Sequence, residues 1–108
     1  MSNVLARNRS ISEMEFYRVA DNLRGELTRF LMDEKKVPKK WRFIFTYPVL
    51  NMTIALFNDI VEANNIFPYT VDAVERRKAV QQRAIDGCDK IYEQLQYMLT
   101  TLCYHNIN

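Results

Sequence analysis

Apolar residues recur along the chain at alternating steps of four and three, the spacing of one face of an α-helix. The first such stripe consists of Phe16, Ala20, Leu23, Leu27 and Phe30. Ser12 followed by Glu15 has the spacing of a capping box, and the stripe stops before the polar run that begins at Asp33. This pattern predicts a helix over residues 12–34, preceded by a flexible segment over residues 1–11.

A second helix is predicted over residues 39–65. Pro38 suits its first turn, where the missing N–H has no helical partner, and Asn64 and Asn65 end the apolar pattern. Pro48 lies inside this stretch and removes a hydrogen bond to the carbonyl of Ile44. We therefore expect a kink at Pro48 rather than a break.

A third helix is predicted over residues 71–103, with Thr70 as its cap. Its apolar stripe is Ala84, Cys88, Ile91, Leu95, Met98 and Leu102. Because the connections between the three helices are only a few residues long, neighbouring helices should run antiparallel. The sequence thus predicts a single all-α domain over residues 1–108, an antiparallel up-and-down helical bundle.

The second predicted helix is apolar on two sides. One stripe includes Phe45, Met52 and Leu56. The other consists of Phe43, Tyr47, Leu50, Ile54, Phe57 and Val61. Two stripes need two surfaces to bury them, so we expect the second stripe to contact a fourth helix, a sister subunit or another partner. The chain is expected to be a homo-oligomer.

Composition narrows the class of protein. Two Gly and three Pro in 108 residues leave little material for a β-sandwich or a glycine-rich phosphate loop. A hydrophobic content of 48% and a net charge of +2 argue against disorder. No uninterrupted run of 18 apolar residues is present, and the N-terminus lacks the apolar core of a signal peptide. We expect a cytoplasmic protein with no membrane partner.

Catalytic chemistry has little support. The lone His105 cannot build a multi-histidine metal site, and there is no Ser-His-Asp set. Cys88 and Cys103 are too far apart on one helix to bridge each other, and their place on the stripe is typical of buried free thiols. The sequence predicts a non-enzyme with no cofactor and no metal.

Basic residues are concentrated in two segments without acids, residues 35–42 and 76–83. They are Lys35, Lys36, Lys39, Lys40, Arg42, Arg76, Arg77, Lys78 and Arg83. Clusters of this kind bind phosphate without reading sequence, so they are candidates for a nucleic-acid-binding site. The alternative is that they are solvated helix ends. Trp41 could stack on a base or, like most tryptophans that begin an apolar stripe, belong to the core.

Three segments carry a resemblance to a known family. They are RNRSISEMEFYRVADNLR, KKVPKKWRFIFTYPVLNMTIALFNDIVEANNIFPYT and ERRKAVQQRAIDGCDKIYEQLQ. Together they resemble the accessory variability determinant (Avd) proteins of bacterial and phage diversity-generating retroelements, relatives of proteins encoded in 23S ribosomal RNA intervening sequences. The most specific parts are VPKKWRF, ANNIFP and ERR, none of which is a catalytic signature.

The resemblance implies a four-helix bundle that assembles into a homopentamer with basic surfaces. Such an assembly binds a reverse transcriptase and its template RNA, or an RNA/DNA hybrid, and assists mutagenic copying without being the polymerase. The matching basic positions are those of residues 35–42 and 76–83. The family's last helix would follow LCYHNIN and is missing from this sequence. A free-standing structural or protein-interaction module of the intervening-sequence type is the alternative.

Overall fold

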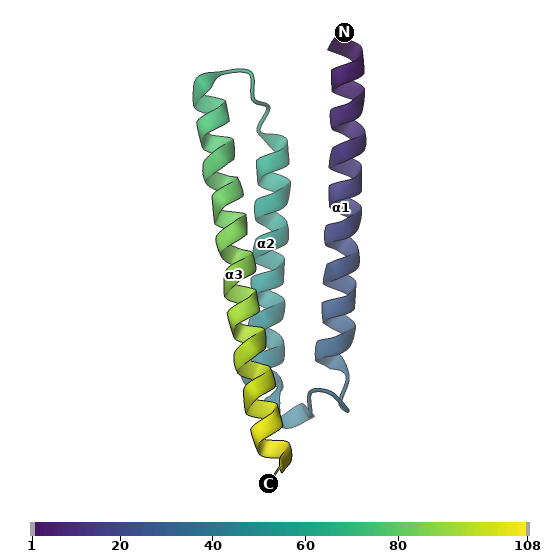
Figure 1. The fold of residues 1–108 in the computed structure, drawn as a ribbon, viewed down its shortest axis with the longest axis vertical. Coiled ribbons are helices and arrows are strands. Elements are labelled where there is room, and N and C mark those ends of the chain that lie inside the picture. The colour runs from purple at the N-terminus through teal and green to yellow at the C-terminus, as the bar shows by residue number, and fades with distance from the viewer. Residues whose placement is uncertain (1, 108) are drawn as a thin grey trace.

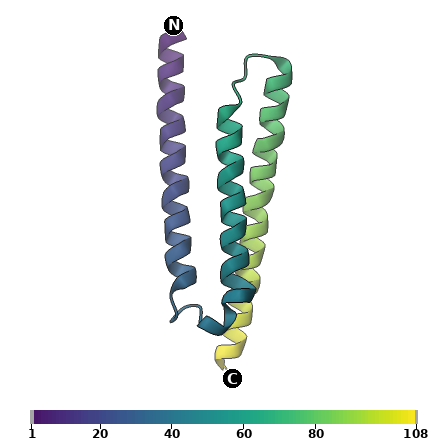
Figure 2. The same ribbon diagram turned by 180° about the vertical axis from the view of Figure 1, so that it is seen from behind.

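The computed structural model describes residues 2–107, and the side chains of residue 15 and residues 17–104 (Figures 1 and 2). The chain forms three long helices, α1 (Ser2–Met32), α2 (Tyr47–Asn65) and α3 (Val71–Ile107). A 3₁₀ turn (Lys39–Trp41) and a π-helical turn (Arg42–Thr46) connect α1 to α2. With no strand among the residues described, the predicted all-α class is confirmed.

The helix boundaries differ from the expected ones at both ends of the chain. Helix α1 begins at Ser2 and continues through Ser12, so the helix does not start at the expected capping box, and residues 2–11 are helical. Helix α3 extends to Ile107, past the predicted end at residue 103. The stripes predicted for the first and third helices thus lie within α1 and α3, and only the positions of the helix ends were predicted wrongly.

The region around Pro48 is the clearest correction. The predicted helix over residues 39–65 is three pieces, and α2 begins at Tyr47, which places Pro48 in its first turn rather than in its interior. A missing N–H costs nothing there. The irregularity lies before the proline instead, where the Tyr47 N–H donates to the carbonyl of Arg42 with π-helical spacing.

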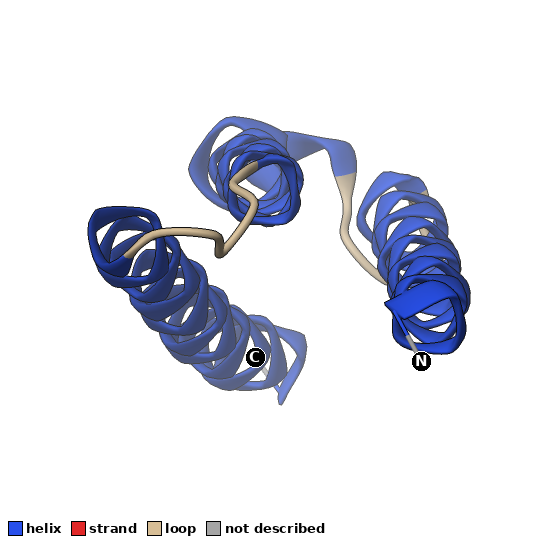
Figure 3. Cartoon of the chain, turned by 90° about the horizontal axis from the view of Figure 1, so that it is seen from above, coloured by secondary structure: helices blue, strands red, loops and turns tan. Residues whose placement is uncertain are grey.

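The three helices run antiparallel to their neighbours, and α2 lies between α1 and α3 (Figures 1 and 3). Viewed from above, they form an open layer rather than a closed ring, because α1 and α3 lie on either side of α2 (Figure 3). The molecule measures 63 × 24 × 17 Å. The sides of α1 and α3 that face each other are therefore uncovered along much of their length.

The main core lies at the end where α1 stops and α3 finishes. Its buried members are Leu31, Val37, Phe45, Val49, Ile91, Met98 and Leu102. At the other end of the hairpin formed by α2 and α3, the buried residues are the small Ala63 and Ala73, followed by Val80. Small side chains let α2 and α3 approach closely there, so the hairpin is packed along its whole length.

Within the described residues, the helical stretch Lys39–Asn65 has the length and mean hydropathy, 1.3, of a membrane-spanning helix, and 22% of that window is buried. The middle helix of a bundle has the same composition, because it has two neighbours to contact. Length and composition therefore do not separate the two cases, and the absence of a membrane partner stays a prediction.

Candidate nucleic-acid interface

Four exposed lysines surround the connection between α1 and α2. We call them the connector lysines: Lys35, Lys36, Lys39 and Lys40. The Lys36 ammonium lies 5.2 Å from the centroid of the Phe30 ring, and that of Lys40 lies 5.6 Å from the centroid of the Trp41 ring. Such cation–π contacts orient the side chains while leaving the charge in water. The connector lysines thus form a cationic surface at one end of the molecule.

Acidic neighbours offset only part of this charge. Glu34 lies 3.7 Å from the Lys39 ammonium, and the Asp33 carboxylate accepts the backbone N–H of Lys35. Exposed ion pairs of this length contribute little free energy and are exchanged easily for another anion. A phosphate group can therefore displace Glu34 from Lys39 at small cost.

Arg42 has a structural position instead. Its side chain is only 15% exposed, and its guanidinium lies 3.4 Å from the carbonyl oxygen of Met32, to which it donates, and 3.6 Å from Glu34. It satisfies a carbonyl at the last turn of α1, where no helical N–H is available. Arg42 therefore ties α1 to the π-helical turn and is poorly placed to bind a ligand.

Trp41 belongs to the core, which supports the second of the two alternatives for this residue. Its ring packs 5.8 Å from that of Phe45, centroid to centroid, and it covers the buried cluster. The contact with Phe45 therefore favours a structural role for Trp41.

The second basic segment, residues 76–83, also contains both exposed cations and cations held by the structure. Arg76 and Lys78 are exposed on the first turns of α3 and form no ion pair with another described residue. Arg77 is half-buried between them, with its Nε atom buried. Arg76 and Lys78 therefore remain candidates for phosphate contacts, at the opposite end of α2 from the connector lysines (Figure 1).

Arg83 connects the two helices of the hairpin. Its guanidinium donates to Asp59 at 3.0 Å and also to Glu62, both on α2. The hydrogen bond and the negative charge of Asp59, followed by the charge of Glu62, raise the pKa of Arg83 above its usual value. Because two carboxylates already surround it, Arg83 contributes little positive potential to a ligand.

The six predicted interface residues on the second stripe differ in their exposure. Phe43, Tyr47 and Ile54 are exposed, and the Phe43 and Tyr47 rings contact each other edge to face at 5.5 Å. Leu50 packs against the core, and Val61 is half-buried. Phe57 lies under the guanidinium of Arg24, 5.3 Å from its ring centroid. The exposed apolar surface of α2 is thus limited to three of these side chains.

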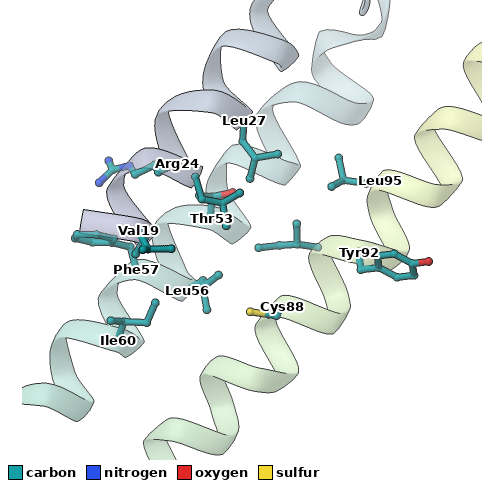
Figure 4. Close-up of a pocket in the computed structure, with 13 residues that line it drawn as sticks. Val19, Arg24, Leu27, Thr53, Leu56, Phe57, Ile60, Cys88, Tyr92 and Leu95 are labelled. Carbon is teal, nitrogen blue, oxygen red and sulfur yellow. The ribbon is translucent and has the colours of Figure 1, made fainter. Parts of the chain in front are cut away.

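A larger apolar surface is the groove between α1 and α3, with α2 as its floor (Figure 4). It has a volume of about 350 Å³ and is lined by side chains that include Val19, Leu23, Phe57, Cys88, Tyr92 and Leu95. Cys88 lies here, and both Cys88 and Cys103 are exposed rather than buried as predicted. Of the predicted second stripe, Phe57 is among the side chains that line this groove.

No family model, curated protein or solved structure matches this chain. Among the described residues, no three His, Cys, Asp or Glu side chains lie together in a way that could hold a metal ion. The likeness to the Avd proteins therefore rests on the motifs alone, and the case for function rests on the surfaces of this molecule.

Proposed function

We propose that this chain is a non-catalytic nucleic-acid-binding protein that acts as one subunit of a larger assembly. The observation that carries the proposal is a set of exposed cations at the two ends of the molecule. Lys35, Lys36, Lys39, Lys40, Arg76 and Lys78 are exposed at the two ends of the molecule. The acids of α2 are held by Arg83 along the side of the hairpin. Phosphate contacts need such exposed cations.

The resemblance to the Avd proteins of bacterial and phage retroelements supports a more specific role, as a cytoplasmic accessory to a reverse transcriptase. In this role the chain holds template RNA, or an RNA/DNA hybrid, while the polymerase copies it. The basic motifs that carry the resemblance include the connector lysines, so one surface supports both the general and the specific proposal.

The test is binding of a labelled structured RNA by a variant with Lys35, Lys36 and Lys40 changed to Gln. Each lost phosphate contact lowers the slope of log affinity against log salt by about 0.7–0.9, so the slope should fall by roughly 2–3. The matched control is Arg18→Gln, Arg29→Gln and Lys90→Gln, which removes the same charge from exposed positions elsewhere. Circular dichroism checks that helix content is unchanged.

Equal weakening by the two triple variants would mean that only net charge matters, and the proposed site would be wrong. Wild-type protein that fails to bind at about 50 mM salt would overturn nucleic-acid binding altogether. Genuine phosphate contacts should also make wild-type affinity fall steeply, by roughly a thousandfold between about 50 and about 200 mM salt for six contacts.

Surface area supports the assembly part of the proposal. The chain has an accessible surface of 8163 Å², whereas a compact monomer of its 12.9 kDa exposes about 6,300 Å². The surplus of roughly 1,900 Å² is within the range that each partner contributes to an obligate interface. We propose that a helix of a second copy lies in the groove between α1 and α3 and completes a four-helix arrangement, with a pentamer as the family-like form.

The second candidate function is a structural or protein-interaction module that binds through α2. The exposed Phe43, Tyr47 and Ile54 favour it. Sedimentation velocity of Leu23→Glu, in the groove, and Ile54→Glu, on the outer face of α2, separates the two surfaces. Dissociation by Leu23→Glu alone supports assembly through the groove, and dissociation by Ile54→Glu alone supports the second candidate. A monomeric wild-type protein would contradict both modes of self-assembly.

A further inference from the structure

Two aromatic rings are exposed at the tip of the hairpin, in the connection between α2 and α3. Phe67 is 56% exposed and Tyr69 is 83% exposed. Their rings are nearly parallel, with an interplanar angle of 13° and centroids 5.8 Å apart. An offset stack of this kind presents a flat aromatic surface to solvent, on which another flat ring can stack.

The backbone holds these rings in place. The Tyr69 N–H donates to the carbonyl of Phe67 at 2.9 Å, and the Ile66 N–H donates to the carbonyl of Ala63 at 3.2 Å. Thr70 caps α3, because its hydroxyl accepts the N–H of Ala73 at 3.0 Å. Pro68, between the two rings, has a fixed φ angle. A ligand would therefore order little additional chain on binding, which favours affinity.

The charges nearby favour one class of ligand. Arg76 and Lys78 can contact phosphates, but Asp72 and Glu75 lie between them and the tip along α3. The closely spaced phosphates of a duplex would lie near these two carboxylates as well as near the cations, which disfavours duplex binding here. A single strand differs, because an unpaired base brings a flat π-surface to the rings while its few phosphates reach the cations.

We propose that the hairpin tip is a stacking platform for an unpaired base of single-stranded nucleic acid. The base stacks on the outer face of Tyr69 and extends the Phe67–Tyr69 stack, and Arg76 and Lys78 contact the flanking phosphates. This inference rests on the proposed nucleic-acid binding and adds the strandedness of the ligand and a second contact site, far from the connector lysines.

The test compares a single-stranded RNA oligonucleotide containing 2-aminopurine with a blunt RNA duplex. Tyr69→Ala should weaken single-strand binding roughly 5- to 160-fold, the range for loss of one aromatic–base stack, and should abolish the quenching of 2-aminopurine fluorescence. Tyr69→Phe keeps the ring and should bind like the wild type. Val71→Ala, also at an exposed position beside the tip, is the matched control. Duplex affinity should be the same for all four proteins.

Four results would overturn the platform. Unchanged single-strand binding by Tyr69→Ala would do so while leaving the proposed function intact, provided that the connector-lysine variant still weakens binding. Equal loss on single strand and duplex would assign Tyr69 a general structural role. A change in sedimentation with RNA affinity intact would make the tip a protein contact. Absence of RNA binding by the wild type would overturn the platform together with the proposed function.

Discussion

The α2–α3 hairpin and helix α1 are attached to the fold in different ways. Buried side chains occur along the whole hairpin, from Ala63 and Ala73 near its tip to Met98 and Leu102 at the far end. On α1, by contrast, Leu31 in the last turn is the one described side chain that is buried. The hairpin is therefore a self-supporting unit, and α1 is an arm fixed at one end.

The exposed part of α1 shows what this difference means for assembly. Val19 is 60% exposed and Leu23 is 52% exposed, although both belong to the side that lines the groove. An apolar helix face that stays this open in one chain would gain stability by closing on another helix. The weakly attached arm is thus the part of the molecule that assembly would stabilise most.

The largest expected effect comes from the residue where arm and hairpin meet. Phe45 is 1% exposed, packs against Trp41 and Tyr97, and shares a cluster with Leu31 and Met98. Phe45→Ala should lower the free energy of unfolding by about 3–5 kcal/mol, a large part of a small domain's stability. Urea denaturation followed by circular dichroism measures it.

Phe43→Ala is the matched control, because Phe43 is 83% exposed and lies two positions away. It should change stability by no more than about 0.5 kcal/mol. Comparable losses for Phe43→Ala and Phe45→Ala would mean that the burial difference is not present in solution.

Leu31→Ala tests the arm directly. Removing this buried side chain should lower the free energy of unfolding by about 2–4 kcal/mol, and α1 should be destabilised most. Hydrogen exchange with mass spectrometry should then show faster exchange in α1 while α2 and α3 stay protected. Leu23→Ala changes a side chain that is 52% exposed, and it should leave the pattern of hydrogen exchange as in the wild type. Uniform loss of protection in all three helices would show that arm and hairpin unfold as one unit.

A buried hydrogen bond between α1 and the π-helical turn gives a third test of the comparison between arm and hairpin, with a smaller expected effect on stability. The Thr46 hydroxyl donates to the carbonyl of Leu31 at 2.9 Å, across the junction of arm and hairpin. The Leu31 carbonyl lies in the last turn of α1 and lacks a helical donor, because the Lys35 N–H donates to the Asp33 carboxylate. Thr46→Val leaves the carbonyl buried without this donor and should cost about 1–2 kcal/mol.

Thr53 provides the contrast within the hairpin. Its hydroxyl donates at 2.9 Å to the carbonyl of Val49, four residues earlier on α2. A mid-helix carbonyl also accepts a backbone N–H, so Thr53→Val removes only a second bond. Thermal denaturation should show a loss well below that of Thr46→Val, and equal losses would argue against a weak point at the junction.

The fold was largely predictable because each helix carries its own periodic stripe. The steps of Ala84, Ile91 and Leu102 place them on one side of α3, where all three are buried or half-buried, although Cys88 of the same stripe is exposed. The boundaries were not predictable in the same way. The capping signal at Ser12 is local, whereas α1 continues in both directions through it, and the π-helical turn before Pro48 has no distinct sequence signature.

The candidate site was predictable as a pair of basic segments but not residue by residue. The sequence does not distinguish Lys40, which points its charge into water, from Arg42, which binds the end of α1. Arg83 likewise required the position of Asp59, 24 residues earlier, to be known. The aromatic residues show the same limit: Trp41 packs against the core, whereas Tyr69, which no periodicity marked, is 83% exposed.

The smallest expected effect compares two ion pairs. Arg83 bridges α3 to Asp59 on α2, whereas Arg18 pairs with Glu15 at 2.8 Å within α1, where both side chains are largely exposed. Arg83→Gln should therefore lower the melting temperature more than Arg18→Gln does, but less than Thr46→Val does. The difference between Arg83→Gln and Arg18→Gln should become smaller in about 1 M salt, because the Debye length is then only about 3 Å.

The pKa of the Arg83 guanidinium is raised in the folded protein. Its stabilising effect is therefore fully present below the pKa that it has in the unfolded chain, and it is lost only as the pH rises through the still higher pKa of the folded state. Melting curves from about pH 7 to about pH 10 should consequently show the same Arg83→Gln effect throughout. An Arg18→Gln loss as large as that of Arg83→Gln would contradict the view that the hairpin, and not the arm, is held together by contacts between helices.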